Sequence, residues 1–348
     1  MKPIRLIWRT DLHLSDRPPA SRKDDWNDSL FEKLEQVKLV AKKVNASAVI
    51  DGGDYFHVKS PSRNSHELVR RSAEHHADYP CPVYCTPGNH DSVYGDYANL
   101  GQQPLGVLFA AGVFQRLFDE HEVYFAGDGV YPKNTKTGEW VNGGIPEEIL
   151  ERPEYPVVRV VGIPYHGTAY DMERFTSIKK GEEDYLVVVA HVLASPHGGS
   201  MFEGEDIVKY RDLAQLDPDL WCFGHWHKDQ GVQEVGGKLF VNVGSLSRGA
   251  LTQDDLDRRP AIVLLTFEEA GIKTQVVRLR VKPNEEVFDL DARVRAHARS
   301  DTMNAFVSMV QETLVAKKKE SLAEQVAEMG SVPQKVRERA GMYLELAR

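Results

Sequence analysis

The stretch Ala46-Ser47-Ala48-Val49-Ile50-Asp51-Gly52-Gly53-Asp54 is the clearest guide to the fold of this sequence. An apolar run, typical of a buried strand, stops abruptly at two acidic residues that flank a pair of glycines. Residues 4–9 and 83–85 are apolar runs of the same form, and they lead into Thr10-Asp11 and Thr86-Pro87-Gly88-Asn89-His90-Asp91. Helices are expected between these runs, over 28–44 and 62–77. This alternation predicts an α/β fold with parallel strands and with polar residues at the carboxyl ends of the strands.

The rest of the sequence is richer in strand-forming residues. Strands are expected over a series of apolar runs: 157–163, 185–190, 220–223, 239–243, 261–267 and 272–281. The glycine-rich stretch 127–156 is expected to form an excursion or a hairpin. After Pro283, helical spacing of apolar residues predicts a small helical appendage, residues 284–348, beside a core of residues 1–283. The apolar stripe of this appendage could pack on the core, pair in a homodimer or bind a partner.

Composition limits the class of protein. The chain has 348 residues, of which 41% are hydrophobic and 27% are charged, which is the balance of a globular domain. No stretch approaches the ~18 apolar residues of a membrane helix, and the start meets a charge too soon for a signal peptide. With only three cysteines, a cytoplasmic location without membrane association is expected. The net charge of −9 argues against a general nucleic-acid coat protein.

Five short motifs, each at the end of a predicted strand, carry side chains of the kinds that bind metal ions. They are Asp11-Leu12-His13, Gly53-Asp54, Gly88-Asn89-His90-Asp91, His191 and Gly224-His225-Trp226-His227. Asp-x-His and His-x-His at a strand end place alternate side chains on one side, so that two residues can share an ion. Carboxylate and imidazole without thiolate suit Mn²⁺, Fe²⁺ or Zn²⁺. Each motif alone is commonly an ordinary turn, but the five in this order predict a metal centre.

This ordered set resembles the calcineurin-like metallophosphoesterase family over roughly residues 4–267. The resemblance implies a two-sheet β-sandwich core flanked by helices. Within the family, Gly52-Gly53-Asp54-Tyr55-Phe56-His57, followed by Ser60-Pro61-Ser62, is similar to the Mre11/SbcD branch of DNA-repair nucleases. Two departures stand out. Thr10 replaces the serine that usually opens the first motif, and the residues after Pro283 leave little room for the capping domain of that branch.

The resemblance also implies a dinuclear metal site. One ion would be held by Asp11, His13, Asp54 and His227. The other would be held by Asp54, Asn89, His191 and His225. Asp54 would bridge the two ions, and two ions ~3.5–4 Å apart can stabilise the charge that develops in phosphoryl transfer. Mn²⁺ is the first expectation for both, with Fe²⁺, Zn²⁺ and Mg²⁺ as alternatives.

Three further residues are expected to be catalytic. By the same resemblance, His90 would face the phosphate or act as a general acid for the leaving oxygen, and Asp91 could orient its ring and raise its pKa. His57 would contact the phosphodiester, or else be a surface loop histidine. Arg248 could meet a phosphate or lie in solvent. The histidines expected to be solvated are His66, His75, His76, His121 and His297.

The resemblance leads to one preferred function and two alternatives. The preferred function is hydrolysis of DNA phosphodiester bonds, as an exonuclease or endonuclease in repair or recombination. DNA would then be the substrate, and an ATPase similar to Rad50/SbcC would be a candidate partner. The first alternative is a phosphoesterase for nucleotides or other small phosphoesters, which the acidic net charge favours. The second is a scaffold that binds DNA ends or a partner without hydrolysis.

Overall fold

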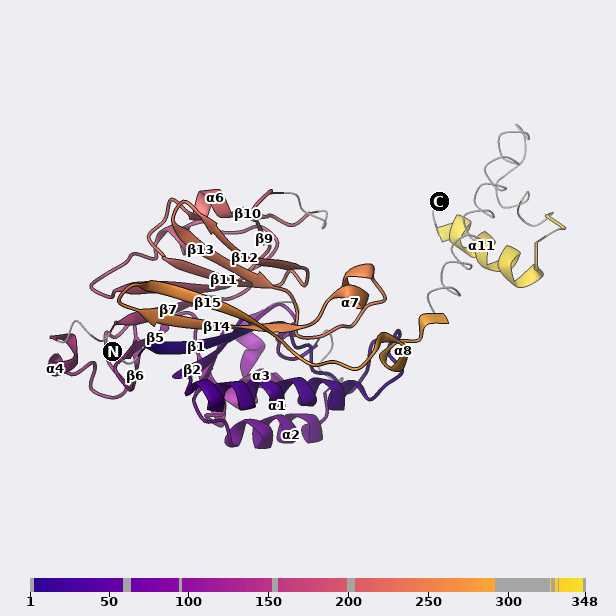
Figure 1. Cartoon of the computed structure of the whole chain (residues 1–348). Helices are drawn as coiled ribbons and strands as arrows, with labels where there is room; N and C mark the ends of the chain where they lie inside the picture. The colour runs from indigo at the N-terminus through magenta and orange to yellow at the C-terminus, as the bar shows by residue number, and fades with distance from the viewer. Residues whose placement is uncertain are drawn as a thin grey trace. The chain divides into compact units, whose positions relative to one another are not determined.

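The computed structural model describes residues 3–58, 64–93, 96–151, 156–198, 204–291, 326, 329–330 and 332–346. The chain divides into two compact units, Met1–Phe288 and Asp289–Arg348. In the larger unit, two β-sheets face each other and helices cover their outer sides (Figure 1). This arrangement confirms the expected α/β class with a two-sheet core.

The first sheet has six strands. Their order is β15 (Gly271–Arg278), β14 (Ala261–Glu268), β1 (Ile4–Arg9), β2 (Ala48–Asp51), β3 (Val83–Cys85) and β4 (Gln115–Arg116). β1 to β4 pair in parallel, whereas β14 and β15 pair antiparallel. The connections between the parallel strands contain α1 (Trp26–Val44), α2 (His66–Ala77), η3 (Tyr97–Gln102) and α3 (Pro104–Ala110). The Asp25 side chain caps α1 by accepting a hydrogen bond from Asp28 N. The helix ends at Asn45, whose backbone adopts the left-handed conformation.

The second sheet has seven strands. Their order is β12 (Asp229–Val235), β13 (Lys238–Val243), β11 (Leu220–Gly224), β8 (Tyr185–His191), β7 (Val158–Ile163), β5 (His121–Ala126) and β6 (Gly129–Asn134). The central strands β13, β11, β8 and β7 pair in parallel. The remaining short elements are α4 (Glu147–Leu150), α5 (Glu173–Thr176), β9 (Ala194–Ser195), β10 (Val208–Lys209), α6 (Tyr210–Leu213), α7 (Gln253–Asp257), α8 (Asn284–Val287) and, in the smaller unit, α11 (Gln334–Leu346).

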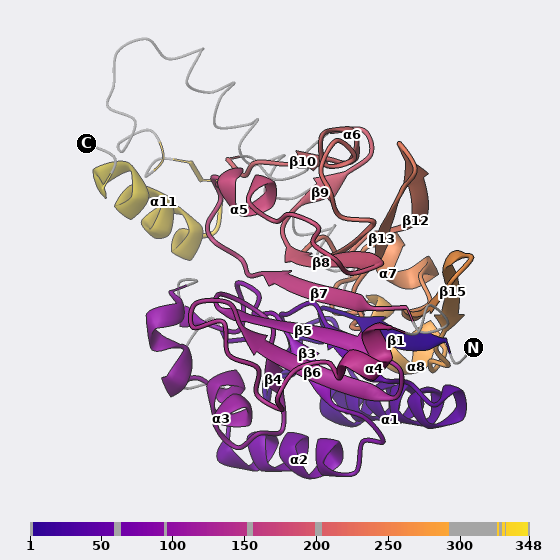
Figure 2. The ribbon, with the colours of Figure 1, turned by 90° about the vertical axis from the view of Figure 1, so that its left-hand side faces the viewer.

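Three layers of apolar side chains hold the larger unit together. Between the sheets, Trp8 of β1 packs in one cluster with Val189 of β8 and Cys222 of β11. A second cluster joins the outer face of the first sheet to α1 to α3, and a third joins the outer face of the second sheet to α5 and α6 (Figure 2). β1 is buried on both faces, because Ile7 points to the helices and Trp8 to the other sheet. The ends of the central strands are therefore held rigidly.

Of the strands that the sequence does not predict, β9 and β10 form a separate two-stranded sheet, and the others lie toward the edges of the two large sheets. β4 has only two residues, and every residue of β12 is at least partly exposed, so neither has a buried apolar run. The stretch 127–156, expected to form an excursion or a hairpin, contains β6. This strand pairs antiparallel with β5, which lies just before the stretch. The apolar stripe expected in the appendage, around residues 303–314, lies outside the described residues. Among the described residues, no helix is long and apolar enough to cross a membrane.

Candidate metal centre

The five predicted motifs meet at the carboxyl ends of the central strands of both sheets. Asp11, Asp54 and Asn89 follow β1, β2 and β3, whereas His191 ends β8 and His225 follows β11. Backbone hydrogen bonds align the first two loops, since Asp11 N donates to Gly53 O at 2.9 Å and His13 N donates to Asp54 O at 2.8 Å. Across the sheets, His225 N donates to the Asp11 carboxylate at 3.1 Å. The motifs of the two sheets are thus connected directly.

Two glycines allow this close approach. A Cβ atom on Gly88 would overlap Asp54 Oδ1 and the His191 ring. A Cβ atom on Gly224 would overlap Thr10 Oγ1 and Gly52 O. The glycines in these motifs are therefore required by the packing of the site.

The first group of donors contains Asp11, His13, Asp54 and His227, whose ligand atoms lie within 4.8 Å of one another. His13 Nε2 lies 3.6 Å from Asp54 Oδ2 and 3.9 Å from Asp11 Oδ1. His227 Nε2 lies 3.6 Å from Asp11 Oδ1 and 2.8 Å from His13 Nε2. Two carboxylates and two imidazoles converge on one point, in the combination expected for the first ion.

The second group contains Asp54, His191 and His225, again within 4.8 Å. His191 Nε2 lies 3.4 Å from Asp54 Oδ2 and 3.2 Å from Asn89 Oδ1. His191 Nδ1 donates a hydrogen bond to Gly52 O at 2.7 Å, so Nε2 is the nitrogen that would bind an ion. The structure therefore gathers the four residues expected at the second ion.

The carboxylate of Asp54 belongs to both groups of donors, so its surroundings test whether two cations fit the site. Asp54 is 1% exposed, and its Oδ1 accepts a hydrogen bond from His90 N at 2.7 Å. Its Oδ2 is buried and accepts no hydrogen bond from any residue that the structure describes. This oxygen lies between the Nε2 atoms of His13 and His191. A buried carboxylate oxygen without a hydrogen-bond donor lowers the stability of the fold. Cations bound beside Asp54 would remove this penalty. The donor set therefore fits two divalent ions.

Backbone strain is concentrated in the same residues. Among the described residues, six non-glycine residues have a positive φ, and four of them are Asp11, His13, Asp54 and His225, with φ of 56°, 55°, 51° and 84°. Such conformations cost about 1–3 kcal/mol each and persist only where the surroundings impose them. The fold accepts this cost in order to aim four donors at one place.

Burial and neighbouring charges shift the proton affinities of the donors. Burial opposes the charged form of Asp54, but the imidazoles of His191 and His90 outweigh it and hold the pKa of the carboxyl well below its usual range. Burial likewise opposes the charged form of His191, but the Asp54 carboxylate raises the pKa of this imidazole to about 9. Burial lowers the pKa of His13 well below its usual value. These opposite shifts show how strongly the groups interact in this small volume.

His57 and His90 lie beside the first group. Their rings stack with centroids 4.5 Å apart at 22°, and His57 Nδ1 lies 3.2 Å from His13 Nδ1. Both rings line a cavity of about 390 Å³ together with His13 and His227. The structure thus places the two predicted substrate-contacting histidines at the entrance to the metal centre.

Asp91 lies in the interior next to the metal centre. Its side chain is fully buried, and its two oxygens accept hydrogen bonds from Phe56 N and Gly88 N, each at 2.9 Å. Burial and the negative charge of Asp54 raise its pKa to about 8. The Asp91 side chain thus holds two loops by their backbone amides. Its expected effect on the His90 ring stays a prediction.

Glu205 is a site residue that the sequence does not reveal. Its Oε1 lies 2.9 Å from His225 Nε2 and accepts a hydrogen bond from the Tyr170 hydroxyl at 2.8 Å. Contact with His225 and Tyr170 lowers the pKa of Glu205 against the effect of its burial. A carboxylate behind a ligating histidine fixes the orientation of the ring. Glu205 therefore supports His225 from outside the group of ligands.

Two expectations require correction. Arg248 is 4% exposed, and its guanidinium donates to Asn284 Oδ1 and Lys282 O, so it neither lies in solvent nor faces the metal centre. His76 is 5% exposed and lies 3.1 Å from Arg9, which pairs with Asp51 at 2.7 Å. His76 therefore belongs to a buried network below the site. His297 lies outside the described residues.

Comparisons with known proteins show which family the chain belongs to. The chain is 29% identical over 146 residues to the double-strand break repair protein mus-23 of Neurospora crassa, and the match covers 32% of this chain and only 18% of that protein. A dimetal phosphatase from Danio rerio has 9% sequence identity and a TM-score of 0.44, over 78% of this chain and 99% of the other. Residues 4–229 match the calcineurin-like phosphoesterase family. Because this match covers more than half of the chain and spans all five motifs, the chain belongs to the calcineurin-like phosphoesterase family.

Proposed function

We propose that this chain is a phosphodiesterase that uses two divalent metal ions to cleave DNA. The observation that carries the proposal is the pair of donor groups that share the buried Asp54 carboxylate. The pair adjoins a cavity lined by two further histidines, which gives a phosphodiester a place beside the ions. Mn²⁺ is the proposed ion, because carboxylate, amide and imidazole donors without thiolate suit it.

The residues divide between the two ions as follows. Asp11, His13, Asp54 and His227 would hold one ion, and Asp54, Asn89, His191 and His225 the other. When bound, two such ions activate water and neutralise phosphate charge. The chain itself fixes the spacing of the donors, because Gly52 O orients His191 and Glu205 orients His225. Rigid donors of this kind reduce the reorganisation needed during the reaction.

His90 and His57 would act on the substrate directly. His90 N donates to Asp54 Oδ1, so this residue is anchored to the bridging carboxylate while its ring lines the cavity. A protonated imidazole there can bind a phosphate oxygen and then donate its proton to the leaving oxygen. The stacked ring of His57 would position the phosphodiester against His90.

Two observations support DNA as the substrate. Residues 52–57 and 60–62 are similar to the corresponding segment of the Mre11/SbcD nucleases. The relative from Neurospora crassa is, by its name, a double-strand break repair protein. The first of these segments contains Asp54, so it bears on the chemistry of the metal centre.

A cleavage assay with defined DNA substrates tests this proposal. End-labelled linear duplex, single-stranded and circular DNA are incubated with purified protein and Mn²⁺, Fe²⁺, Zn²⁺ or Mg²⁺. Cleavage by the wild type and none by Asp54→Ala is expected. Loss of labelled ends alone would indicate an exonuclease, whereas nicking of circles would indicate an endonuclease. Turnover of a small phosphodiester without any cleavage of DNA would refute the nuclease assignment.

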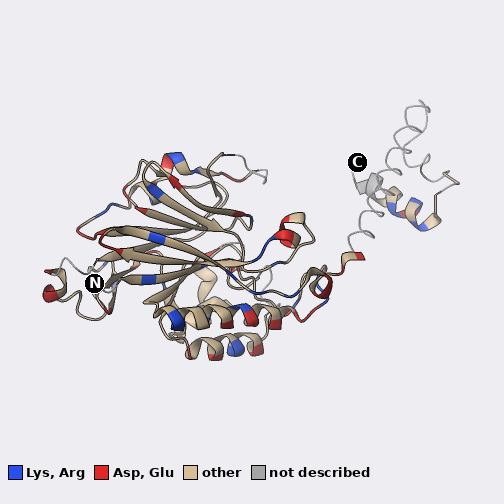
Figure 3. Ribbon diagram, viewed as in Figure 1, with Lys and Arg blue, Asp and Glu red and all other residues tan. Residues whose placement is uncertain are grey.

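A second candidate is a phosphoesterase for nucleotides or other small phosphoesters. The net charge of −9 favours it, and acidic and basic residues are interspersed along the larger unit rather than forming one basic stripe in this view (Figure 3). The salt dependence of activity separates the candidates. A steep fall of activity with rising salt indicates a polyanionic substrate, whereas a flat response favours the small one.

A further inference from the structure

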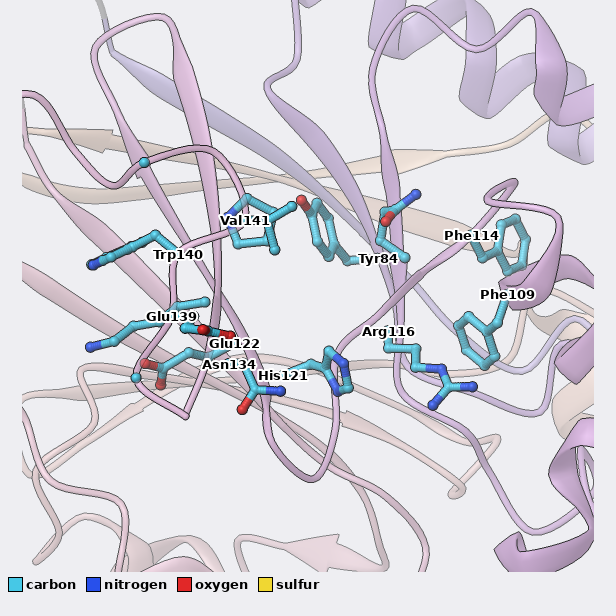
Figure 4. Close-up of a pocket in the computed structure, with 15 residues that line it drawn as sticks. Tyr84, Phe109, Phe114, Arg116, His121, Glu122, Asn134, Glu139, Trp140 and Val141 are labelled. Carbon is cyan, nitrogen blue, oxygen red and sulfur yellow. The ribbon is translucent and has the colours of Figure 1, made fainter. Parts of the chain in front are cut away.

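A second cavity, of about 750 Å³, is lined by the outermost strands of both sheets. β4 ends the six-stranded sheet and β6 ends the seven-stranded sheet, and the loop 138–143 completes the wall. Among the described residues, it shares no lining residue with the cavity at the metal centre. Figure 4 shows two opposite sides, with Tyr84 and His121 between them. One side carries Phe109, Phe114 and Arg116, and the other carries Glu139, Trp140 and Val141.

Four aromatic side chains, those of Tyr84, Phe109, Phe114 and Trp140, line this cavity. Phe114 is 1% exposed and Phe109 is 8% exposed, so both are fixed by the core around them. Trp140 packs against Tyr124 with ring centroids 5.0 Å apart. Flat apolar walls around a volume of this size are typical of sites for small organic ligands.

Tyr84 brings a hydroxyl group to the cavity. Its side chain is 3% exposed, and its hydroxyl points toward the side of Trp140 and Val141 in Figure 4. The hydroxyl makes no hydrogen bond within the described ranges of the chain, and the buried Nδ1 of His121 has no hydrogen-bond partner there either. A buried polar atom is normally satisfied, so His121 Nδ1 calls for a partner from outside the protein, and the Tyr84 hydroxyl is available to donate to the same ligand.

Two cations line the same cavity without acidic partners. The Arg116 guanidinium lies 5.8 Å from the centroid of the Phe109 ring, and Lys133 Nζ lies 5.0 Å from that of Trp140. Neither cation forms an ion pair with any residue that the structure describes. Cations over aromatic rings, beside an apolar wall, suit a ligand that is both aromatic and negatively charged.

Two carboxylates, those of Glu122 and Glu139, also line the cavity, and they differ in whether their charge is already compensated. Glu122 pairs with Arg159 at 2.6 Å and accepts a hydrogen bond from the Tyr124 hydroxyl, so its charge is already compensated. Glu139 is exposed and accepts a hydrogen bond from the Thr137 hydroxyl at 3.2 Å. Arg116 is exposed like Glu139, so the half-buried Lys133 is the cation that stays uncompensated closest to the interior of the cavity.

We infer that this cavity binds a small planar aromatic anion, namely an aromatic ring that carries a phosphate or a carboxylate. The ring would pack between the aromatic walls, and an acceptor atom of the ligand would take the hydrogen bond that the Tyr84 hydroxyl can donate. The acidic group would lie near Arg116 and Lys133. The site is separate from the metal centre and does not depend on the function proposed for that centre.

Calorimetric titration of the full chain with four probes tests the inference. AMP carries a ring and a phosphate, indole-3-acetate carries a ring and a carboxylate, adenosine lacks the anion, and inorganic phosphate lacks the ring. All titrations contain EDTA, so that binding through metal ions is removed. At least one of the two aromatic anions is expected to bind about tenfold or more tightly than adenosine or phosphate. No binding of either aromatic anion at millimolar concentration would overturn the inference.

Substitutions then locate the binding site. Tyr84→Phe keeps the ring that packs against Phe125 and removes only the hydroxyl, and Arg116→Gln removes the charge. Each is expected to weaken binding of the aromatic anion by about tenfold. Lys136→Gln, in the turn that follows β6 and outside the cavity lining, is the matched control and should leave binding unchanged. Wild-type affinity in both cavity variants, with melting temperatures preserved, would also refute the site.

Discussion

Replacing Lys33 by methionine should stabilise the protein at neutral pH. Lys33 lies in α1 and is 2% exposed, and its Nζ donates to Ser29 O at 3.1 Å and to Ser29 Oγ at 3.3 Å. Burial, reinforced by the positive charges of Arg22 and Arg248, lowers its pKa from 10.5 to about 7, while Asp24 and Glu32 offset this only in part. A methionine of similar length would fill the same space without a charge.

The magnitude follows from these values. A pKa lowered from 10.5 to about 7 corresponds to a penalty of about 5 kcal/mol on the charged form in the folded state. Methionine forfeits the two hydrogen bonds to Ser29, at about 1 kcal/mol each. Lys33→Met should therefore raise the free energy of unfolding by about 2–3 kcal/mol near pH 7.

The pH dependence has a definite sign. Between about pH 7 and 10.5 the unfolded chain holds the Lys33 proton and the folded chain has released it, so the unfolded state binds more protons. The wild type therefore gains stability as pH rises through this window, and Lys33→Met lacks this gain. The advantage of the variant should shrink by up to about 3 kcal/mol between about pH 7 and 9.5.

Urea unfolding of both proteins at these two pH values, with a chelator present, measures the effect. The difference between the two proteins cancels other titrating groups. Lys42→Met, at an exposed position of the same helix, is the control and should change stability by less than about 0.5 kcal/mol. A variant less stable than the wild type at neutral pH, or a gap that does not change with pH, would contradict the reasoning.

The other predictions concern the metal centre. Asp54→Ala should lose bound metal, whereas His90→Ala should keep it and lower turnover by about 10²–10⁴-fold, and equal metal loss in elemental analysis would refute the role given to His90. Gly88→Ala should reduce metal content because its Cβ would overlap Asp54 Oδ1, and unchanged content in a folded variant would show that the loop can yield. Glu205→Gln should weaken metal affinity about 10–100-fold by loosening the His225 ring, and wild-type affinity in a metal titration would remove Glu205 from the site.

Much of the fold and of the arrangement of the candidate site follows from one property of the sequence, namely apolar runs that end at polar residues. Asp11, Asp54 and Asn89 can be placed together because parallel neighbours end at the same edge of a sheet. His191 and His225 obey the same rule in the second sheet, through the parallel pair β8 and β11. That the gathered residues bind metal stays a prediction.

The residues that the sequence could not place depend on tertiary contacts. Glu205 belongs to a loop and meets a histidine twenty positions further along the chain, so no local pattern indicates it. His76 lies on a helix with many polar residues, and only the buried pair of Arg9 and Asp51 explains why its ring is enclosed. Asp91 is the last residue of the third motif, but its carboxylate turns inward and accepts hydrogen bonds from backbone amides.

The division of the donors between the two sheets has a mechanical consequence. Asp11, His13, Asp54 and Asn89 come from loops of one sheet, and His191, His225 and His227 come from the other. Ions held at this centre would cross-link the two halves of the sandwich, much as a disulfide joins distant segments. Resistance to heat and to proteases should then depend on free metal concentration, because ligands of the native state stabilise it in proportion to their saturation. Removal of metal would then abolish the proposed activity and would also weaken the association of the two sheets.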